Sequence, residues 1–232
     1  CLNGVAWYLS VQAFLYAIFP WLLAVLKKAD TRRLRCIAAA IFCAQFLFSF
    51  AIWKAGLSGK AVFYLTYLCP LFRAGDFAIS CCMGCLYRSR KEERIPYGAF
   101  SLLELAAVLF SGGCFFIAAR QVGALGAVAF RYNVLFTPSA VLLVWLLAVG
   151  KGVISRLLSA KPFLWLAGLS PYGFLIHQVL IRYMELAANK LGLTAHPVVW
   201  TLTVFLLTLC LSSFYKALER RVRGRHDKAA AQ

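Results

Sequence analysis

Residues 5–26, VAWYLSVQAFLYAIFPWLLAVL, contain no charged side chain, and the basic cluster KKADTRRLR at residues 27–35 follows them directly. A helix of about 20 apolar residues is long enough to cross the hydrocarbon core of a bilayer. The stretch therefore predicts a membrane-spanning helix that ends at a charged loop.

Six further apolar runs meet the same length rule, at residues 36–53, 61–87, 97–119, 132–150, 163–187 and 197–216. One of these runs is interrupted between Pro70 and Asp76, so we expect a short first segment, a break, and a helix from about Phe77. The sequence thus predicts an all-α integral membrane bundle of about seven transmembrane helices, one of them broken. We expect a single membrane domain over residues 1–219 and a basic tail over 220–232.

The composition excludes other classes of protein. Hydrophobic residues make up 62% of the chain and charged residues 14%, far below the roughly 25% typical of soluble proteins. The net charge of +17 comes from short clusters between apolar runs, a pattern that argues against nucleic-acid binding.

Most of the nine cysteines lie in or beside apolar runs, and Cys81, Cys82 and Cys85 lack a nearby second pair or histidine. We interpret them as packing residues and predict no metal site.

Basic residues lie mainly in alternate loops, and short loops rich in Lys and Arg stay in the cytoplasm. With seven spans and the N-terminus outside, 18 of the 25 basic residues are cytoplasmic. The other seven are Lys54, Lys60, Arg73, Arg120, Arg131, Arg182 and Lys190. We therefore expect a cytoplasmic C-terminus whose tail faces anionic lipid.

Polar residues within the apolar runs are costly in lipid and become candidates for function. They are Gln12, Arg73, Asp76, Glu104 and His177. Each also has a structural interpretation. Gln12 could join helices, Arg73 and Asp76 could form an ion pair that closes the break, and Glu104 could reach toward a cation such as Arg94 or a helix outside this chain.

Four stretches, in order along the chain, resemble the signatures of membrane acyltransferase family 3, whose bacterial members O-acetylate surface polysaccharides. They are WYLSVQAFLYAIFP at 7–20, PLFRAGDF at 70–77 followed by Gly84, the segment from Lys151-Gly152 through SPYGFLIHQ at 170–178, and FYK at 214–216 followed by Glu219. Because they extend over nearly the whole chain, together they are more specific than any one short motif.

The resemblance implies transfer of an acyl group from cytoplasmic acyl-CoA, with acetyl-CoA as the family default, to a hydroxyl of a cell-surface or exported polysaccharide. It places the protein in the bacterial cytoplasmic (inner) membrane. Such a transfer needs a base for the hydroxyl and donors for the developing oxyanion. The resemblance implies Arg73, oriented by Asp76, as an electrostatic stabiliser or donor anchor and His177 as a polar cavity residue that supports the missing base. It implies Ser10, Gln12 and Ser170 as substrate-binding residues.

The family fold has about ten helices, and its catalytic histidine lies on the first of them. We therefore expect this chain to be the C-terminal portion of such an enzyme and to be inactive by itself. Two alternatives remain. A polysaccharide or small-molecule transporter would also use broken helices and charges at membrane depth. A non-catalytic relative would explain why Gln12 stands where the family has an acidic residue.

The uneven distribution of basic residues predicts the topology. Cysteine-accessibility labelling should place residues 27–35 and 88–96 on the cytoplasmic side and residues 54–60 on the outer side. Labelling in the reverse sense would contradict the proposed orientation.

Overall fold

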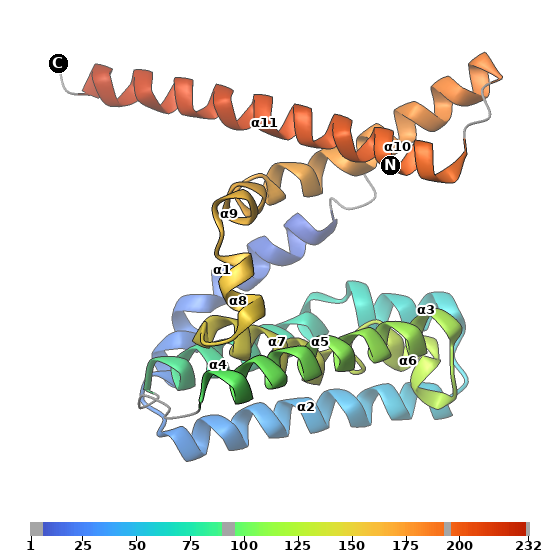
Figure 1. Cartoon of the computed structure of the whole chain (residues 1–232). Helices are drawn as coiled ribbons and strands as arrows, with labels where there is room; N and C mark the ends of the chain where they lie inside the picture. Colours follow the sequence, from blue (N-terminus) through green and yellow to red (C-terminus); the bar gives the residue numbers. More distant parts are fainter. Residues whose placement is uncertain (1–6, 90–95, 193–195, 231–232) are drawn as a thin grey trace. The chain divides into compact units, whose positions relative to one another are not determined.

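Helices form every regular element of the described residues, which are 7–89, 96–192 and 196–230 of the computed structural model (Figure 1). Five segments are long and apolar enough to cross a membrane. They are α1 (Trp7–Leu26), α2 (Thr31–Lys54), the composite segment Gly59–Ser89, α5 (Tyr97–Arg120) and the stretch Pro197–Arg221 of α11 (Pro197–Ala230). The predicted all-α, multi-pass membrane protein is therefore confirmed.

The two other apolar runs fold less regularly than the sequence predicts. Residues 163–187 lie in a bent pair, α9 (Lys161–Ala167) and α10 (Ser170–Leu191), which differ in direction by 59°. The run 132–150 becomes α7 (Thr137–Val149), a helix of only 13 residues that begins next to Pro138. The described residues thus provide five candidate spans, or six with the bent pair, and one shorter apolar helix in place of seven full spans.

The chain divides into two compact units. Unit 1 consists of Cys1–Leu9 and Ser159–Gln232, and unit 2 consists of Ser10–Leu158. Within unit 1, α10 packs along α11. Within unit 2, α2 packs on α4 (Pro70–Ser89), α4 contacts α7, and α7 packs on α5. The elements of unit 2 that carry polar residues are therefore neighbours.

The break in the third apolar segment lies before Pro70, earlier than predicted. A short helix α3 (Gly59–Phe63) leads into a π-helical turn, η1 (Tyr64–Leu68), and Cys69 is extended with φ −64° and ψ 119°. The helix α4 then begins at Pro70. Proline disfavours the helical conformation for the residue before it and has no N–H to lose at a helix start, so it begins a helix here. The expected helix start near Phe77 is wrong.

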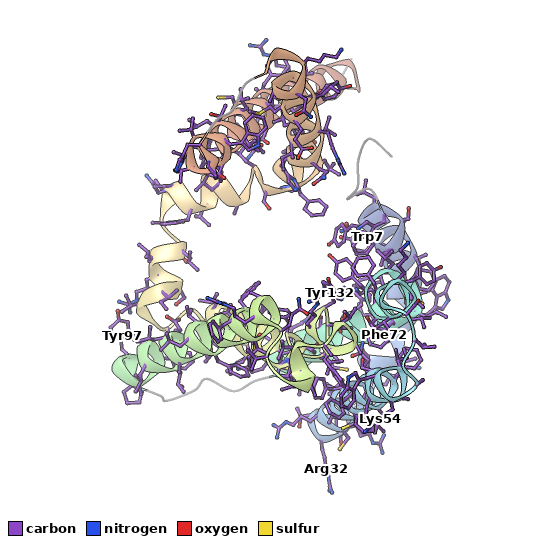
Figure 2. All side chains as sticks on the ribbon, turned by 90° about the vertical axis from the view of Figure 1, so that its right-hand side faces the viewer. Trp7, Arg32, Lys54, Phe72, Tyr97 and Tyr132 are labelled. Atoms are coloured by element: carbon purple, nitrogen blue, oxygen red, sulfur yellow. The ribbon has the colours of Figure 1, made fainter. Side chains whose placement is uncertain are left out.

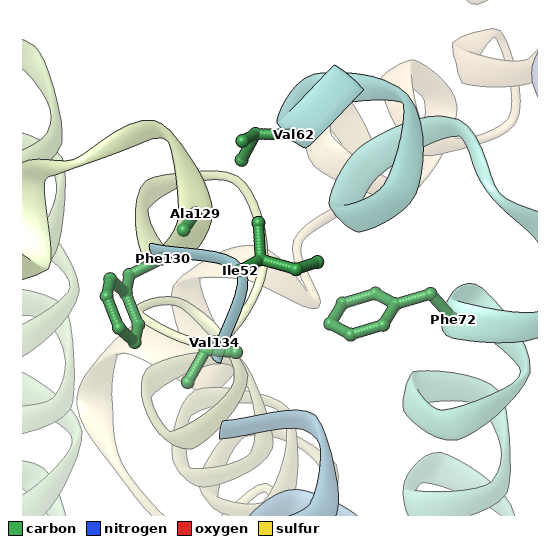
Figure 3. Packing of buried hydrophobic residues seen from close by; sticks show 6 residues of the cluster. All are labelled: Ile52, Val62, Phe72, Ala129, Phe130 and Val134. Atoms are coloured by element: carbon green, nitrogen blue, oxygen red, sulfur yellow. The ribbon is translucent and has the colours of Figure 1, made fainter. Parts of the chain in front are cut away.

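A cluster of buried apolar side chains fixes the ends of several helices of unit 2. Figure 3 shows Phe72 at the start of α4 pointing toward Ile52 at the end of α2, with Phe130 and Val134 nearby. Val62 of α3 and Ala129 of α6 (Val128–Arg131) complete the cluster. The short 3-10 helix η2 (Ala124–Gly126) leads from α5 to α6. This packing holds residues 132–136, which connect α6 to α7, close to the beginning of α4.

Large apolar side chains project from the helices, and Figure 2 shows the side chains of the described residues. In the most apolar 18 residues of each candidate span, at most 17% are buried inside the protein. Trp21, for example, is 71% exposed and Leu71 is 74% exposed. A surface of this kind is unusual in water but is the normal surface of a protein in lipid.

Glu104 of α5 is fully buried, and its carboxylate binds backbone N–H groups. Its Oε1 accepts a hydrogen bond from the Gly152 amide at 3.1 Å, and its Oε2 accepts from Ile154 at 2.8 Å and Ser155 at 3.3 Å. These amides open α8 (Val153–Leu158), where unpaired N–H groups favour a negative charge. Backbone amides thus fill the role expected for Arg94, which lies outside the described residues, or for a further helix.

Gly152→Ala should destabilise unit 2, because a Cβ atom at this position would lie 2.2 Å from the carboxyl group of Glu104. We expect a loss of about 1–3 kcal/mol, the usual cost of overpacking. Gly98→Ala is the matched control, since a Cβ atom there meets nothing within 4 Å. Thermal unfolding of the purified protein in detergent measures both variants. Equal midpoints for Gly152→Ala and wild type would contradict the close approach of Glu104.

Candidate active site

The candidate site lies where α4 begins, beside the break in the helix. The Cys69 amide donates to the Tyr64 carbonyl at 2.9 Å, and the Arg73 amide donates to the Cys69 carbonyl at 3.1 Å. Because Pro70 has no N–H, the turn before it cannot continue the regular ladder of helix hydrogen bonds. Carbonyl groups next to the break therefore need other donors.

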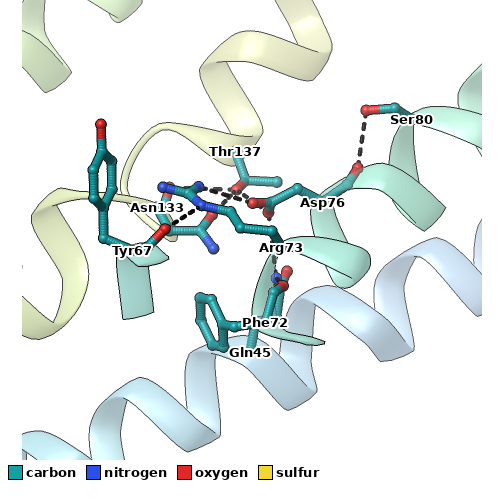
Figure 4. A network of polar contacts seen from close by, with 8 residues as sticks. All are labelled: Gln45, Tyr67, Phe72, Arg73, Asp76, Ser80, Asn133 and Thr137. Carbon is teal, nitrogen blue, oxygen red and sulfur yellow. Dashed lines mark hydrogen bonds and ion pairs between the residues drawn. The ribbon is translucent and has the colours of Figure 1, made fainter. Parts of the chain in front are cut away.

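Arg73 supplies one of these donors and binds Asp76 at the same time (Figure 4). Its Nε donates to the Tyr67 carbonyl at 2.9 Å, and its Nη1 donates to Oδ2 of Asp76 at 3.1 Å. The guanidinium also lies over the Tyr67 ring, 4.7 Å from the ring centre. The side chain of Arg73 is 18% exposed and that of Asp76 is 27% exposed, so the pair is accessible as well as structurally engaged.

Gln45 of α2 completes the contacts of Asp76 from a second helix. The Gln45 side chain is almost fully buried, and its Nε2 donates to the Phe72 carbonyl at 2.9 Å and to Oδ1 of Asp76 at 3.3 Å. Gly75 makes this approach possible, because a Cβ atom there would lie 2.6 Å from Gln45 Nε2. The sequence analysis missed Gln45. An amide inside the apolar run 36–53 is the same signal that identified Gln12.

Thr137 contributes a polar group from the start of α7, and Asn133 contributes one from the turn before that helix. Thr137 Oγ1 lies 3.4 Å from Oδ1 of Asp76 and 3.0 Å from Oδ1 of Asn133. Asn133 is buried, with 3% of its surface exposed. Neither residue was predicted, because both lie at the edge of an apolar run where polar residues are ordinary.

A cavity of about 490 Å³ extends from this polar cluster between α4 and α7. Arg73, Asp76, Tyr132, Asn133 and Thr137 lie at one end of it. Small and apolar side chains form the wall beyond them, including Ile79, Met83, Gly84, Val141 and Val144.

The far end of the cavity lies between Tyr87 of α4 and Trp145 and Ala148 of α7. The Tyr87 hydroxyl donates to the Ala148 carbonyl at 2.8 Å, and the Tyr87 and Trp145 rings meet edge to face at 5.9 Å. Arg73 and Tyr87 are 14 positions apart on α4, or about 21 Å at a rise of ~1.5 Å per residue. The cavity is thus a long apolar groove with a charged pair near one end.

Ser10 and Gln12 of α1 also belong to unit 2 but make local contacts. Gln12 Nε2 donates to the Tyr16 hydroxyl at 2.6 Å, one turn along the same helix. Ser10 is exposed. Within the described residues, the structure gives neither side chain a hydrogen bond to Arg73 or Asp76, so it does not bring the predicted substrate-binding pair to the groove.

Ser170 and His177 belong to unit 1. Ser170 is the exposed first residue of α10, and His177 Nδ1 lies 3.0 Å from the Gly173 carbonyl. The ring of Phe174 lies 5.9 Å from His177 and 5.2 Å from Tyr8. His177 is therefore anchored to its own helix, within a set of aromatic contacts.

Three of the four recognised stretches also meet in unit 1. The Tyr172 hydroxyl donates to Oε2 of Glu219, which joins α10 to α11. The contact between Tyr8 and Phe174 joins the first stretch to the third. Residues far apart in the sequence thus share one packing unit.

The described residues hold no group of three His, Cys, Asp or Glu side chains that could bind a metal ion. Cys82 is instead fully buried against Leu26, Leu34 and Leu86.

Comparison with known proteins identifies the family. No curated protein and no solved structure matches the chain. The model of acyltransferase family 3, described as an acyltransferase domain, matches residues 2–216 and so includes both the Arg73–Asp76 pair and His177. The chain therefore belongs to acyltransferase family 3, a family of membrane acyltransferases.

Proposed function

We propose that the protein transfers an acyl group, acetyl by family default, from cytoplasmic acyl-CoA to a hydroxyl of a cell-surface or exported polysaccharide. We place it in the bacterial cytoplasmic membrane with its C-terminus in the cytoplasm. The observation that carries this proposal is the groove between α4 and α7, which has Arg73 and Asp76 near one end and reaches Tyr87 and Ala148 at the other.

The charges around the groove support the entry of acyl-CoA from its cytoplasmic end. Arg88 follows Tyr87 at the end of α4, and Lys151 follows closely after Ala148. Both belong to the basic loops that the positive-inside rule assigns to the cytoplasm. They can attract the phosphates of CoA at that side, while the thin and mostly uncharged pantetheine arm extends along the apolar groove. The thioester would then lie near Arg73.

The proposed chemistry uses Arg73 as the stabiliser of the oxyanion. The acceptor hydroxyl loses its proton to a base and attacks the thioester carbonyl, whose oxygen takes the negative charge. The C–O bond forms, the C–S bond breaks, and the CoA thiolate leaves and is protonated. A guanidinium has five N–H donors, and two atoms, Nε and Nη1, make the hydrogen bonds that the structure gives it, so donors remain for the oxyanion. His177 is proposed to support the base.

A transporter has one structural feature in its favour, a second interruption where α9 and α10 meet. Transporters use interrupted helices to leave carbonyl groups open for ions. At the first interruption Arg73 already occupies the Tyr67 carbonyl. This contact, together with the family, favours acyl transfer.

Substitution of both members of the ion pair separates a catalytic from a structural role. If Arg73 only neutralises Asp76, removing both charges should be tolerated better than removing one. In the full-length protein, Arg73→Gln/Asp76→Asn should reach the membrane at a near-normal level and lose transfer by about a hundredfold or more. Arg73→Lys should also be impaired, because an ammonium lacks the planar donor fork. The assay follows labelled acetyl groups from acetyl-CoA into polysaccharide, and full activity of the double variant would refute the catalytic role.

Gly84→Leu should block the groove without disturbing the helix. Gly84 lines the groove, and a Cβ atom there meets nothing within 4 Å, so a larger side chain can enter the open space. We expect normal membrane levels, loss of acyl transfer and weaker binding of acetyl-CoA. Gly112→Leu is the matched control, since Gly112 also has open space but does not line this groove. Undiminished transfer by Gly84→Leu would exclude the groove as the donor path.

A further inference from the structure

The Arg73 end of the groove carries more positive charge than its carboxylate balances. Asp76 pairs with Arg73, whereas the second guanidinium, that of Arg131 at the end of α6, contacts Tyr132. Its Nη2 donates to the Tyr132 hydroxyl at 3.0 Å, and it lies over the same ring, 4.9 Å from the centre. Its Nε is buried without a hydrogen-bond partner among the described residues.

Tyr132 and Asn133 carry unused donors to the wall of the groove. The Tyr132 oxygen accepts from Arg131, so its own proton remains able to donate. Asn133 is 3% exposed; its Oδ1 accepts from Thr137, and its buried Nδ2, which interacts electrostatically with Asp76, has no partner within hydrogen-bond distance among the described residues. A buried donor without a partner costs free energy, which a ligand that offers acceptor oxygens would recover.

The position of these groups strengthens the case for an anionic ligand. The N-termini of α4 and α7 lie at this end of the groove, and helix N-termini favour negative charge. In the proposed orientation this is also the outer end. The positive-inside rule explains cations at the cytoplasmic end but gives no reason for Arg131 here. A partly buried cation is costly unless a counter-charge or an anionic ligand faces it.

We propose that Tyr132 and Asn133, which line the Arg73 end of the groove (the acceptor end) with Arg131 beside them, bind a carboxylate carried by a sugar of the acceptor, so that the substrate is an acidic polysaccharide. This inference rests on the proposed function. Tyr132 and Asn133 donate to the carboxylate, and Arg131 acts as a positioning residue that holds and polarises the Tyr132 hydroxyl. A hydroxyl of the bound sugar then lies beside Arg73, where the thioester is expected.

Equilibrium binding tests this site without relying on turnover. The full-length protein in phosphatidylcholine nanodiscs is titrated with a galacturonate oligomer and with its carboxyl-reduced, neutral counterpart. We expect the acidic oligomer to bind about tenfold tighter or more, the usual effect of charge-assisted hydrogen bonds. Arg131→Gln should lower the affinity for the acidic oligomer to about that for the neutral oligomer. Tyr132→Phe keeps the ring that packs against Phe63 and Tyr67, and should lose part of the preference.

Arg120→Gln is the matched control, because Arg120 is an exposed cation at the end of α5 and its removal changes the net charge equally. Equal binding of the two oligomers, or equal effects of Arg120→Gln and Arg131→Gln, would overturn the proposal. Free galacturonate and glycerol 3-phosphate are then compared as competitors of the acidic oligomer. If glycerol 3-phosphate displaces it at the same concentration as galacturonate does, the site is a lipid-headgroup site and the proposal is overturned. Transfer is measured separately. Absence of acetyl transfer to either oligomer, with the binding preference intact, would count against the proposed function and leave the anion site standing.

Discussion

The guanidinium of Arg73 satisfies a backbone carbonyl beside an interruption of the helix at membrane depth, and the arrangement of unit 2 around the groove depends on it. Without water to replace lost hydrogen bonds, an interrupted helix in lipid is stable only when side chains bind the exposed backbone groups. Arg73 does so for Tyr67, and Asp76 then holds the charged group in place. Gln45 and Thr137 bring α2 and α7 to the same carboxylate. One contact thus links the break, the helix packing and the charged end of the groove.

The sequence predicted the parts of the fold that depend on length and polarity. Apolar runs identified the long helices, since the bilayer imposes a minimum length, and Pro70 indicated an interrupted segment. The exact place of the break was not predicted, because Pro70 can be read either as the cause of irregular structure after it or as the first residue of a helix. Partners across helices were also out of reach. Nothing in the local sequence indicates that Gln45 meets Asp76 or that Glu104 caps α8, because both contacts depend on how the helices pack.

The recognised stretches serve packing as well as chemistry. Glu219, three residues beyond the end of the family match, binds Tyr172, and Tyr8 near its beginning packs on Phe174. These contacts hold unit 1 together. Arg73 and Asp76, in contrast, lie on the surface of a groove in unit 2 and keep part of their surface accessible. A short motif in a membrane protein therefore identifies ancestry more directly than it identifies the reacting groups.

The hydrogen bond from Tyr87 to Ala148 has a consequence for the energy supply of the cell. A wide, water-filled passage through a membrane protein would let hydrated ions flow down the membrane potential, which stores about 2.3 kcal/mol per elementary charge at 100 mV. Tyr87 and Trp145 join α4 to α7 at one end of the groove, and the wall beyond them is formed by Met83, Val141 and Val144. Such a wall wets poorly, so under the proposed function a thin acyl carrier would fit along the groove while hydrated ions would be excluded. The apolar lining would in this way limit the leakage of ions along the groove.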